Sequence, residues 1–161
     1  MGHSKDTNLT NTLSELHAAL PLIANQSTRP EAARSFTTAF YSLYSTLRAG
    51  LGEAQKQEAD RFLTGSAHLI EPALPFLDYN LSDRIDARLT AGAQNEDWPI
   101  ICQLRSALEA FKELYEAHLP MSDLIPDDPD LDQALKDHAK DRAGGAAPKG
   151  FPKDHWWWNY A

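Results

Sequence analysis

The chain has 161 residues, of which 42% are hydrophobic and 24% are charged, and its formal net charge is −8. This length and composition are typical of one globular domain with a single hydrophobic core. The negative charge argues against a nucleic-acid partner, because a phosphate backbone is bound by a basic face. No stretch approaches the roughly 18 apolar residues of a membrane-spanning helix, so no membrane partner is expected.

The sequence predicts a cytoplasmic protein. Its one cysteine, Cys102, excludes an internal disulfide and fits a reducing compartment. The first twenty residues contain no continuous apolar run of the kind found in a secretory signal. Cys102 falls on the apolar side of a predicted helix, where a free cysteine is most often a packing residue.

Apolar residues at steps of three and four predict helices from the start of the chain. The first two are expected over 9–23 and 28–49, the second with Pro30 in its first turn and Gly50 at its end. A third helix is expected over 53–70. These three segments have the clearest periods and stop signals in the sequence.

The middle of the chain is predicted to alternate between connectors and helices. Pro72 and Pro75 interrupt the helical period, so Leu74, Phe76, Leu77 and Tyr79 are interpreted as an apolar connector. A short fourth helix that carries Leu81, Ile85 and Leu89 follows, with Ser82 as a candidate cap and its end near Gly92. The longest helix is expected over 97–119.

No segment shows the alternation and β-branched residues of a strand, and valine is absent. A weak sixth helix is expected after the Asp127–Pro129 cap. The sequence therefore predicts an all-α, single-domain antiparallel bundle of about five to six helices over 1–142, followed by a Gly/Pro/Lys linker and aromatic tail over 143–161. The predicted core comprises Leu13, Leu16, Leu20, Phe36, Phe40, Leu43, Phe62, Leu104, Leu108 and Phe111.

No cofactor, metal or catalytic residue is predicted. None of the six histidines has a glutamate three positions before it, as a di-metal bundle requires. The His-Glu-x-x-His, glycine-rich phosphate-loop and Gly-x-Ser-x-Gly motifs are absent. His17, His68 and His118 fall on or beside apolar helix faces. They support an alternative hypothesis, in which the bundle is an enzyme or metal protein with interior histidines.

The tail contains three consecutive tryptophans. Three adjacent indoles cannot all face one core, so we expect one or two anchored rings and at least one ring at the rim. The tail either folds back on its own bundle or docks on another protein, because aromatic residues bury large areas and anchor interfaces. The candidate partner-binding residues are Phe151, His155, Trp156, Trp157, Trp158 and Tyr160.

The leading functional hypothesis is a non-enzymatic, acidic protein-interaction module with the tryptophan-rich tail as a docking segment. Its concrete form is a small inhibitor, immunity or antitoxin-like protein, whose charge would steer association with a basic protein. A second alternative beside the enzyme or metal protein is a homodimeric scaffold with tails exchanged between protomers.

Overall fold

The computed structural model describes residues 2–91, 97–139 and 147–158, with residues 2–7 described for their backbone alone. The helices are α1 (Gly2–Ala24), α2 (Arg29–Ala49), α3 (Glu53–Ile70), α4 (Leu74–Thr90), α5 (Trp98–Tyr115), α6 (Met121–Leu124) and α7 (Pro129–Ala139), with the 3-10 turns η1 (Glu71–Ala73) and η3 (Trp156–Trp158). These ranges contain no strand, which confirms the predicted all-α bundle.

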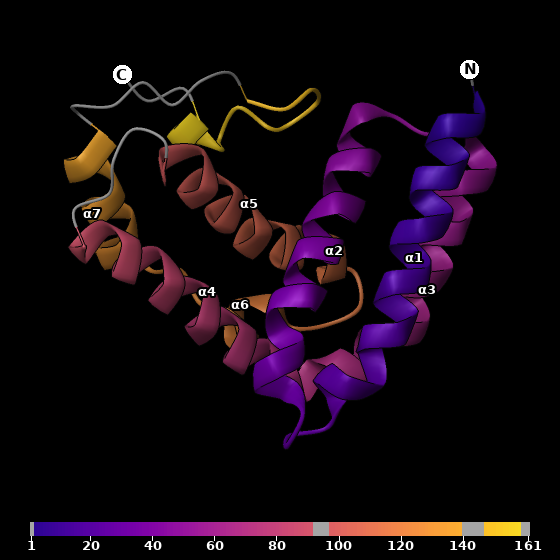
Figure 1. Ribbon diagram of the computed structural model, residues 1–161, viewed down its shortest axis with the longest axis horizontal. Helices are drawn as coiled ribbons and strands as arrows, with labels where there is room; N and C mark the ends of the chain where they lie inside the picture. The colour runs from indigo at the N-terminus through magenta and orange to yellow at the C-terminus, as the bar shows by residue number, and fades with distance from the viewer. Residues whose placement is uncertain (1, 92–96, 140–146, 159–161) are drawn as a thin grey trace.

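Helix α2 lies at the centre of the molecule. It packs against α1 on one side and α5 on the other, while α3 lies beside α1 and α7 lies beside α4 (Figure 1). Helices α4 and α5 pack together below the C-terminal segment. Among the described helices, none combines the length and hydropathy that crossing a bilayer requires.

Stacked aromatic rings join α2 to α5. Phe40 lies 4.4 Å from Phe111 and 5.5 Å from Tyr115 between ring centroids, and both pairs are close to parallel. Phe36 extends the stack, 6.2 Å from Phe111. All ten residues predicted for the core are buried, none more than 9% exposed. The helical period therefore identified the correct faces.

Several predicted boundaries are confirmed. Helix α3 covers the predicted range, and α2 carries Pro30 in its first turn, where a missing N–H costs no hydrogen bond. Asp128 Oδ1 accepts the backbone N–H of Leu131 at 3.0 Å and caps α7. The predicted boundary between bundle and tail, at residues 142–143, lies outside the described residues.

The predicted connector over Leu74, Phe76, Leu77 and Tyr79 is wrong, because these residues are helical. Pro75 stands in the first turn of α4, which begins at Leu74 rather than at residue 82. The apolar residues Leu74, Leu77 and Leu81 recur at helical spacing and are fully buried. Their burial explains why this segment continues as a helix. At the other end, α5 is shorter than expected and stops at Tyr115.

Candidate functional site

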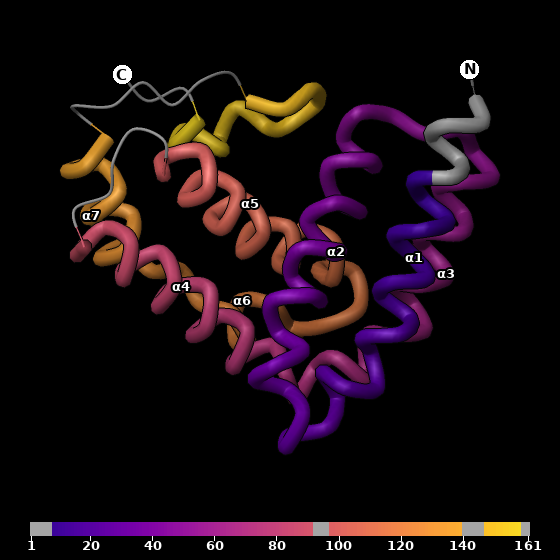
Figure 2. The backbone as a smooth tube through the Cα atoms, in the orientation of Figure 1, coloured from indigo at the N-terminus to yellow at the C-terminus, as the bar shows by residue number. Residues whose placement is uncertain are grey.

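The docked tail, defined as residues 147–158, folds back on its own chain and contacts α2, α5 and α7 (Figure 2). Phe151 packs edge-on against Tyr44 of α2, with ring centroids 5.2 Å apart. Turn η3 lies against α5 and α7. The tail thus closes over a region built by three helices.

Gly150 allows the docked tail to turn close to α2. Its φ of 83° lies in the left-handed region, which glycine adopts without strain. Its carbonyl oxygen accepts a hydrogen bond from Arg48 Nε at 2.8 Å. A Cβ at this position would collide with the backbone carbonyl of Arg48. Glycine is therefore required here by both conformation and space.

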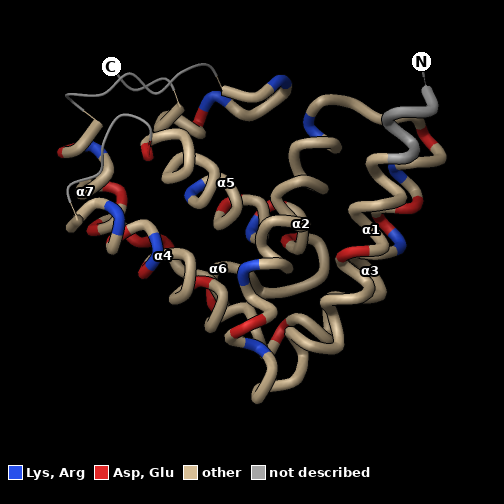
Figure 3. Tube along the Cα trace, in the orientation of Figure 1, with Lys and Arg blue, Asp and Glu red and all other residues tan. Residues whose placement is uncertain are grey.

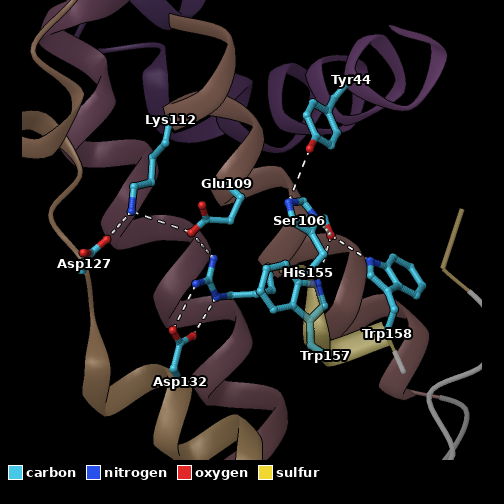
Figure 4. Close-up of polar contacts among 10 residues, drawn as sticks. Tyr44, Ser106, Glu109, Lys112, Asp127, Asp132, His155, Trp157 and Trp158 are labelled. Atoms are coloured by element: carbon cyan, nitrogen blue, oxygen red, sulfur yellow. Dashed lines mark hydrogen bonds and ion pairs between the residues drawn. The ribbon is translucent and has the colours of Figure 1, made fainter. Parts of the chain in front are cut away.

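Ser106 is the centre of the buried network that holds the tail (Figure 4). Trp157 Nε1 donates to Ser106 Oγ at 3.0 Å, and Trp158 Nε1 donates to the same oxygen at 2.8 Å. His155 Nδ1 lies 3.0 Å from that oxygen. Ser106 has no exposed surface. One serine on α5 therefore orients three aromatic side chains of the tail.

The protons of this network can be assigned from hydrogen-bonding capacity. A hydroxyl has two lone pairs and one hydrogen, while an indole N–H only donates. The two indoles occupy both lone pairs of Ser106, so its hydrogen is donated to His155 Nδ1. His155 is then neutral, with its proton on Nε2. That nitrogen lies 3.4 Å from Tyr44 Oη, which in turn donates to Glu113 Oε1 at 3.4 Å.

The environment of His155 agrees with this assignment. Burial is the main cause that lowers the pKa of His155, to about 4, since a charged imidazole would lose its hydration. Asp154 and Glu109 act in the opposite direction, whereas Arg105 and Arg48 lower the pKa further. Ser106 has no exposed surface, and the two indole N–H groups occupy its lone pairs, so its oxygen is not free to attack a substrate.

Arg105 ties α5, α7 and the docked tail together. Its guanidinium donates to both Asp132 oxygens, at 2.9 and 3.2 Å, and to Glu109 Oε1 at 2.7 Å. Its Cζ lies 4.5 Å from the centre of the Trp157 ring, a cation–π distance. Burial alone would lower the pKa of Arg105, but the two carboxylates outweigh it and the pKa is raised.

Cys102 is a packing residue, as the sequence predicts. It is fully buried, and its thiol donates to the carbonyl oxygen of Trp157 at 3.3 Å. Burial raises the pKa of this thiol to about 12. The thiolate required for nucleophilic chemistry is therefore disfavoured.

The three adjacent tryptophans differ in burial as the sequence predicts, with two anchored rings and one ring at the rim. Trp157 and Trp158 are anchors, 1% and 5% exposed, and His155 is also buried. Trp156 stays half-buried at the rim, with Lys136 Nζ 5.5 Å from its ring centre. Phe151 is half-buried as well. Tyr160 lies outside the described residues.

Three histidines lack the interior placement that the alternative enzyme or metal hypothesis requires. His17, His68 and His118 are all exposed, on α1, on α3 and after the end of α5. Only His17 contacts an aromatic core residue, edge-on to Phe62 at 5.1 Å. Within the described ranges no three histidine, cysteine or carboxylate side chains are grouped as metal ligands. Among the histidines whose burial the structure describes, the buried one is His155, which the sequence places in the tail.

An acidic groove of about 380 Å³ runs between α4 and α7. It is called the α4/α7 groove, and the charged or aromatic residues that line it are Tyr79, Asp83, Asp86, Asp128 and Asp130. Among the residues that the structure describes, no lysine or arginine lines it. Tyr79 is 71% exposed. Figure 3 shows acidic positions on both of these helices.

A second hollow, of about 600 Å³, lies between α5, the segment 119–127 and the docked tail. It is also acidic, but Lys112 lies within it and pairs with Asp127 at 2.6 Å. Lys112 Nζ is also 3.8 Å from Glu109 Oε1. Part of the negative charge here is therefore neutralised within the chain, unlike that of the α4/α7 groove.

The sequence predicts that the tail docks, but it does not identify the residues of α5 that contact it. Ser106 and Arg105 are polar residues within the long apolar helix α5, and Ser106 stands one turn after Cys102. A polar pair within an apolar stripe was the available signal, because buried polar groups need partners. The sequence alone does not predict the acidic lining of the α4/α7 groove, because its two walls come from helices far apart in sequence.

Comparison with known proteins gave no match: no family model, no curated protein and no solved structure is similar to this chain.

Proposed function

We propose that the protein is a non-enzymatic interaction module that binds a basic segment of another protein in the α4/α7 groove. The observation that carries this proposal is Tyr79, an exposed aromatic residue beside four aspartates, with no cation among the described residues that line the groove. Exposed tyrosines are common anchors of protein interfaces. A concrete form is an acidic inhibitor or immunity-type protein with a basic target.

The groove has the chemistry to receive an arginine or lysine side chain. The aliphatic part of such a side chain packs on an aromatic ring while its charged end reaches carboxylates. Asp83, Asp86 and Asp130 form no ion pair with any residue in the described ranges. Their charge is free to attract a cationic partner, with an effect that is largest at low ionic strength.

The docked tail supports this function by fixing one wall of the groove. Helix α7 supplies Leu131 to that wall, and Arg105 holds the adjacent Asp132 against α5. The ring of Trp157 covers the same guanidinium. We therefore assign Trp157 an internal supporting role, whereas Trp156 at the rim remains accessible to a partner.

The proposal is tested with a fluorescein-labelled nine-residue arginine peptide titrated against the full chain and followed by fluorescence anisotropy. Tyr79→Ala and the double variant Asp83→Asn, Asp86→Asn should each weaken binding several-fold. The matched control is Glu58→Gln, Asp60→Asn. It removes two exposed carboxylates from α3, so it has the same net charge as the groove variant.

Equal weakening in the groove variant and the α3 control would contradict the proposal, because binding would then follow net charge alone. An unchanged affinity in Tyr79→Ala would also contradict it. Light scattering of the same samples tests the alternative of tail exchange. A chain that is a dimer without peptide, and a monomer when 147–161 are deleted, would favour the exchanged-tail scaffold instead.

A further inference from the structure

A further cavity, which is lined by a cation instead of by carboxylates, lies where α2, α4 and α5 meet. It measures about 100 Å³ and is lined by side chains from all three helices, including Thr37, Tyr41, Arg84, Ile100 and Gln103. Ile100 and Gln103 are exposed, so the cavity reaches the surface. None of the described residues that line it is an aspartate or glutamate. The chain as a whole has a net charge of −8, whereas the described lining of this cavity is positively charged through Arg84.

Two of the lining groups are buried without a hydrogen-bond partner. Thr37 is only 3% exposed, and its Oγ1 has no partner. Thr46, on the same helix, donates to the carbonyl of Ser42 at 2.8 Å, which is the usual arrangement for a helical threonine. The Nη1 of Arg84 is also buried and unpaired. Buried polar atoms normally have partners, so both groups keep hydrogen-bonding capacity at this cavity.

The charge around Arg84 is also uncompensated. Burial is the first cause that lowers the pKa of Arg84, and the nearby cations Arg34 and Arg88 lower it further. Arg88 is paired with Asp97 at 3.1 Å, but Arg84 forms no ion pair with any described residue. Arg84 is half-buried and its Nη1 has no partner, so an anion at this atom would offset the cost of burying part of the charge.

We propose that this cavity binds a small oxyanion, a carboxylate or phosphate group, with Arg84 as the counter-ion and Thr37 as a hydroxyl donor. Guanidinium groups present parallel N–H donors that match the oxygen atoms of such anions. Tyr41 lines the same cavity, and burial raises the pKa of its phenol to about 12, so its hydroxyl keeps its hydrogen. All three named side chains can therefore donate. The ligand is independent of the α4/α7 groove.

The test measures binding of inorganic phosphate and of acetate to the full chain by isothermal titration calorimetry at pH 7.5, with sodium chloride holding the ionic strength constant. Arg84→Met should weaken binding of the preferred anion by about tenfold or more. Thr37→Val keeps the side-chain shape and removes only the hydroxyl, and it should weaken binding several-fold. The control is Arg61→Met, an exposed cation on α3.

A preference for phosphate or for acetate supports the proposal and identifies the anionic group. Anion binding no stronger than that of chloride would overturn it. So would equal loss in Arg84→Met and Arg61→Met, since the effect would then be general screening. Thr37→Val keeps the test decisive if Arg84→Met fails to fold, because an unaltered affinity in the valine variant would by itself overturn the assignment.

Discussion

Ser106 Oγ lies 3.0 Å from Nδ1 of His155, although 49 positions separate the two residues. The same oxygen accepts the indole N–H groups of Trp157 and Trp158. The serine hydrogen can then be donated only to His155 Nδ1, so this contact fixes the tautomer of His155 with its proton on Nε2. The tail is therefore held by a directional network as well as by aromatic burial.

Replacing Ser106 by alanine should lower the free energy of unfolding by about 2–4 kcal/mol. The change leaves two buried indole N–H groups and one imidazole nitrogen without a partner, and each such group costs about 1–3 kcal/mol. Urea denaturation of both proteins measures the difference. Ser35→Ala, at an exposed position of α2, is the control and should change stability by less than about 0.5 kcal/mol. Similar values for both variants would mean that the network contributes nothing.

Protonation of His155 should weaken tail docking in acid. Its pKa falls from 6.5 to about 4 on burial, so the neutral form is the one that folds. The corresponding stability is fully present above pH 6.5 and is lost as the pH falls toward 4, because the unfolded chain takes up the proton first. The loss approaches about 3 kcal/mol. Denaturation at a series of pH values measures it.

His155→Asn is the matched variant for this pH series, since its side-chain oxygen can accept from Ser106 without titrating. Glu113 works in the opposite direction: burial raises its pKa, so acid favours the folded state at that carboxyl. The difference between wild type and His155→Asn removes this contribution. If the two proteins lose stability with the same slope between pH 6.5 and 4, His155 is not the titrating group.

Two glycine-to-alanine substitutions should change the stability of the protein in opposite directions. Gly150→Ala places a Cβ against the Arg48 carbonyl at a φ of 83°, and it should destabilise the tail by at least about 1–3 kcal/mol. Gly65→Ala, within α3, meets open space and should stabilise by about 0.5–1 kcal/mol. Thermal denaturation of both variants gives the signs. Stabilisation by Gly150→Ala would show that the tail does not turn there.

The three tryptophans should differ in energetic importance. Trp157→Ala should cost about 3–5 kcal/mol, because the ring is 1% exposed and stacks over Arg105. Trp156→Ala should cost less than about half of that, because its ring stays at the rim. Chemical denaturation followed by circular dichroism avoids dependence on indole fluorescence. Equal costs would contradict the distinction between anchor and rim.

The fold was largely predictable because helical periodicity is a local property. Helix α3 and the Phe36–Phe40 face follow from spacing and stop signals alone. Pro75 misled the prediction, because a proline is as compatible with the first turn of a helix as with its end. Local patterns identify helices better than they distinguish a helix start from a break.

The candidate site was less predictable because its contacts join distant segments. Adjacent indoles predicted anchors and a rim, yet their acceptor Ser106 lies about fifty positions earlier. His17 shows the converse problem. It is next to a buried stripe in sequence and exposed in space, since one position along a helix rotates a side chain by about 100°.

The hydrogen bond from Arg48 to Gly150 joins residues 102 positions apart, so docking the tail closes a long loop of the chain. Ring closure over that length carries an entropic cost that short helical hairpins avoid. Helices α1 and α2 can pair early, because their contacts are local. The docked tail is then expected to be the last segment to gain hydrogen-exchange protection during refolding and the first to lose it in mild denaturant.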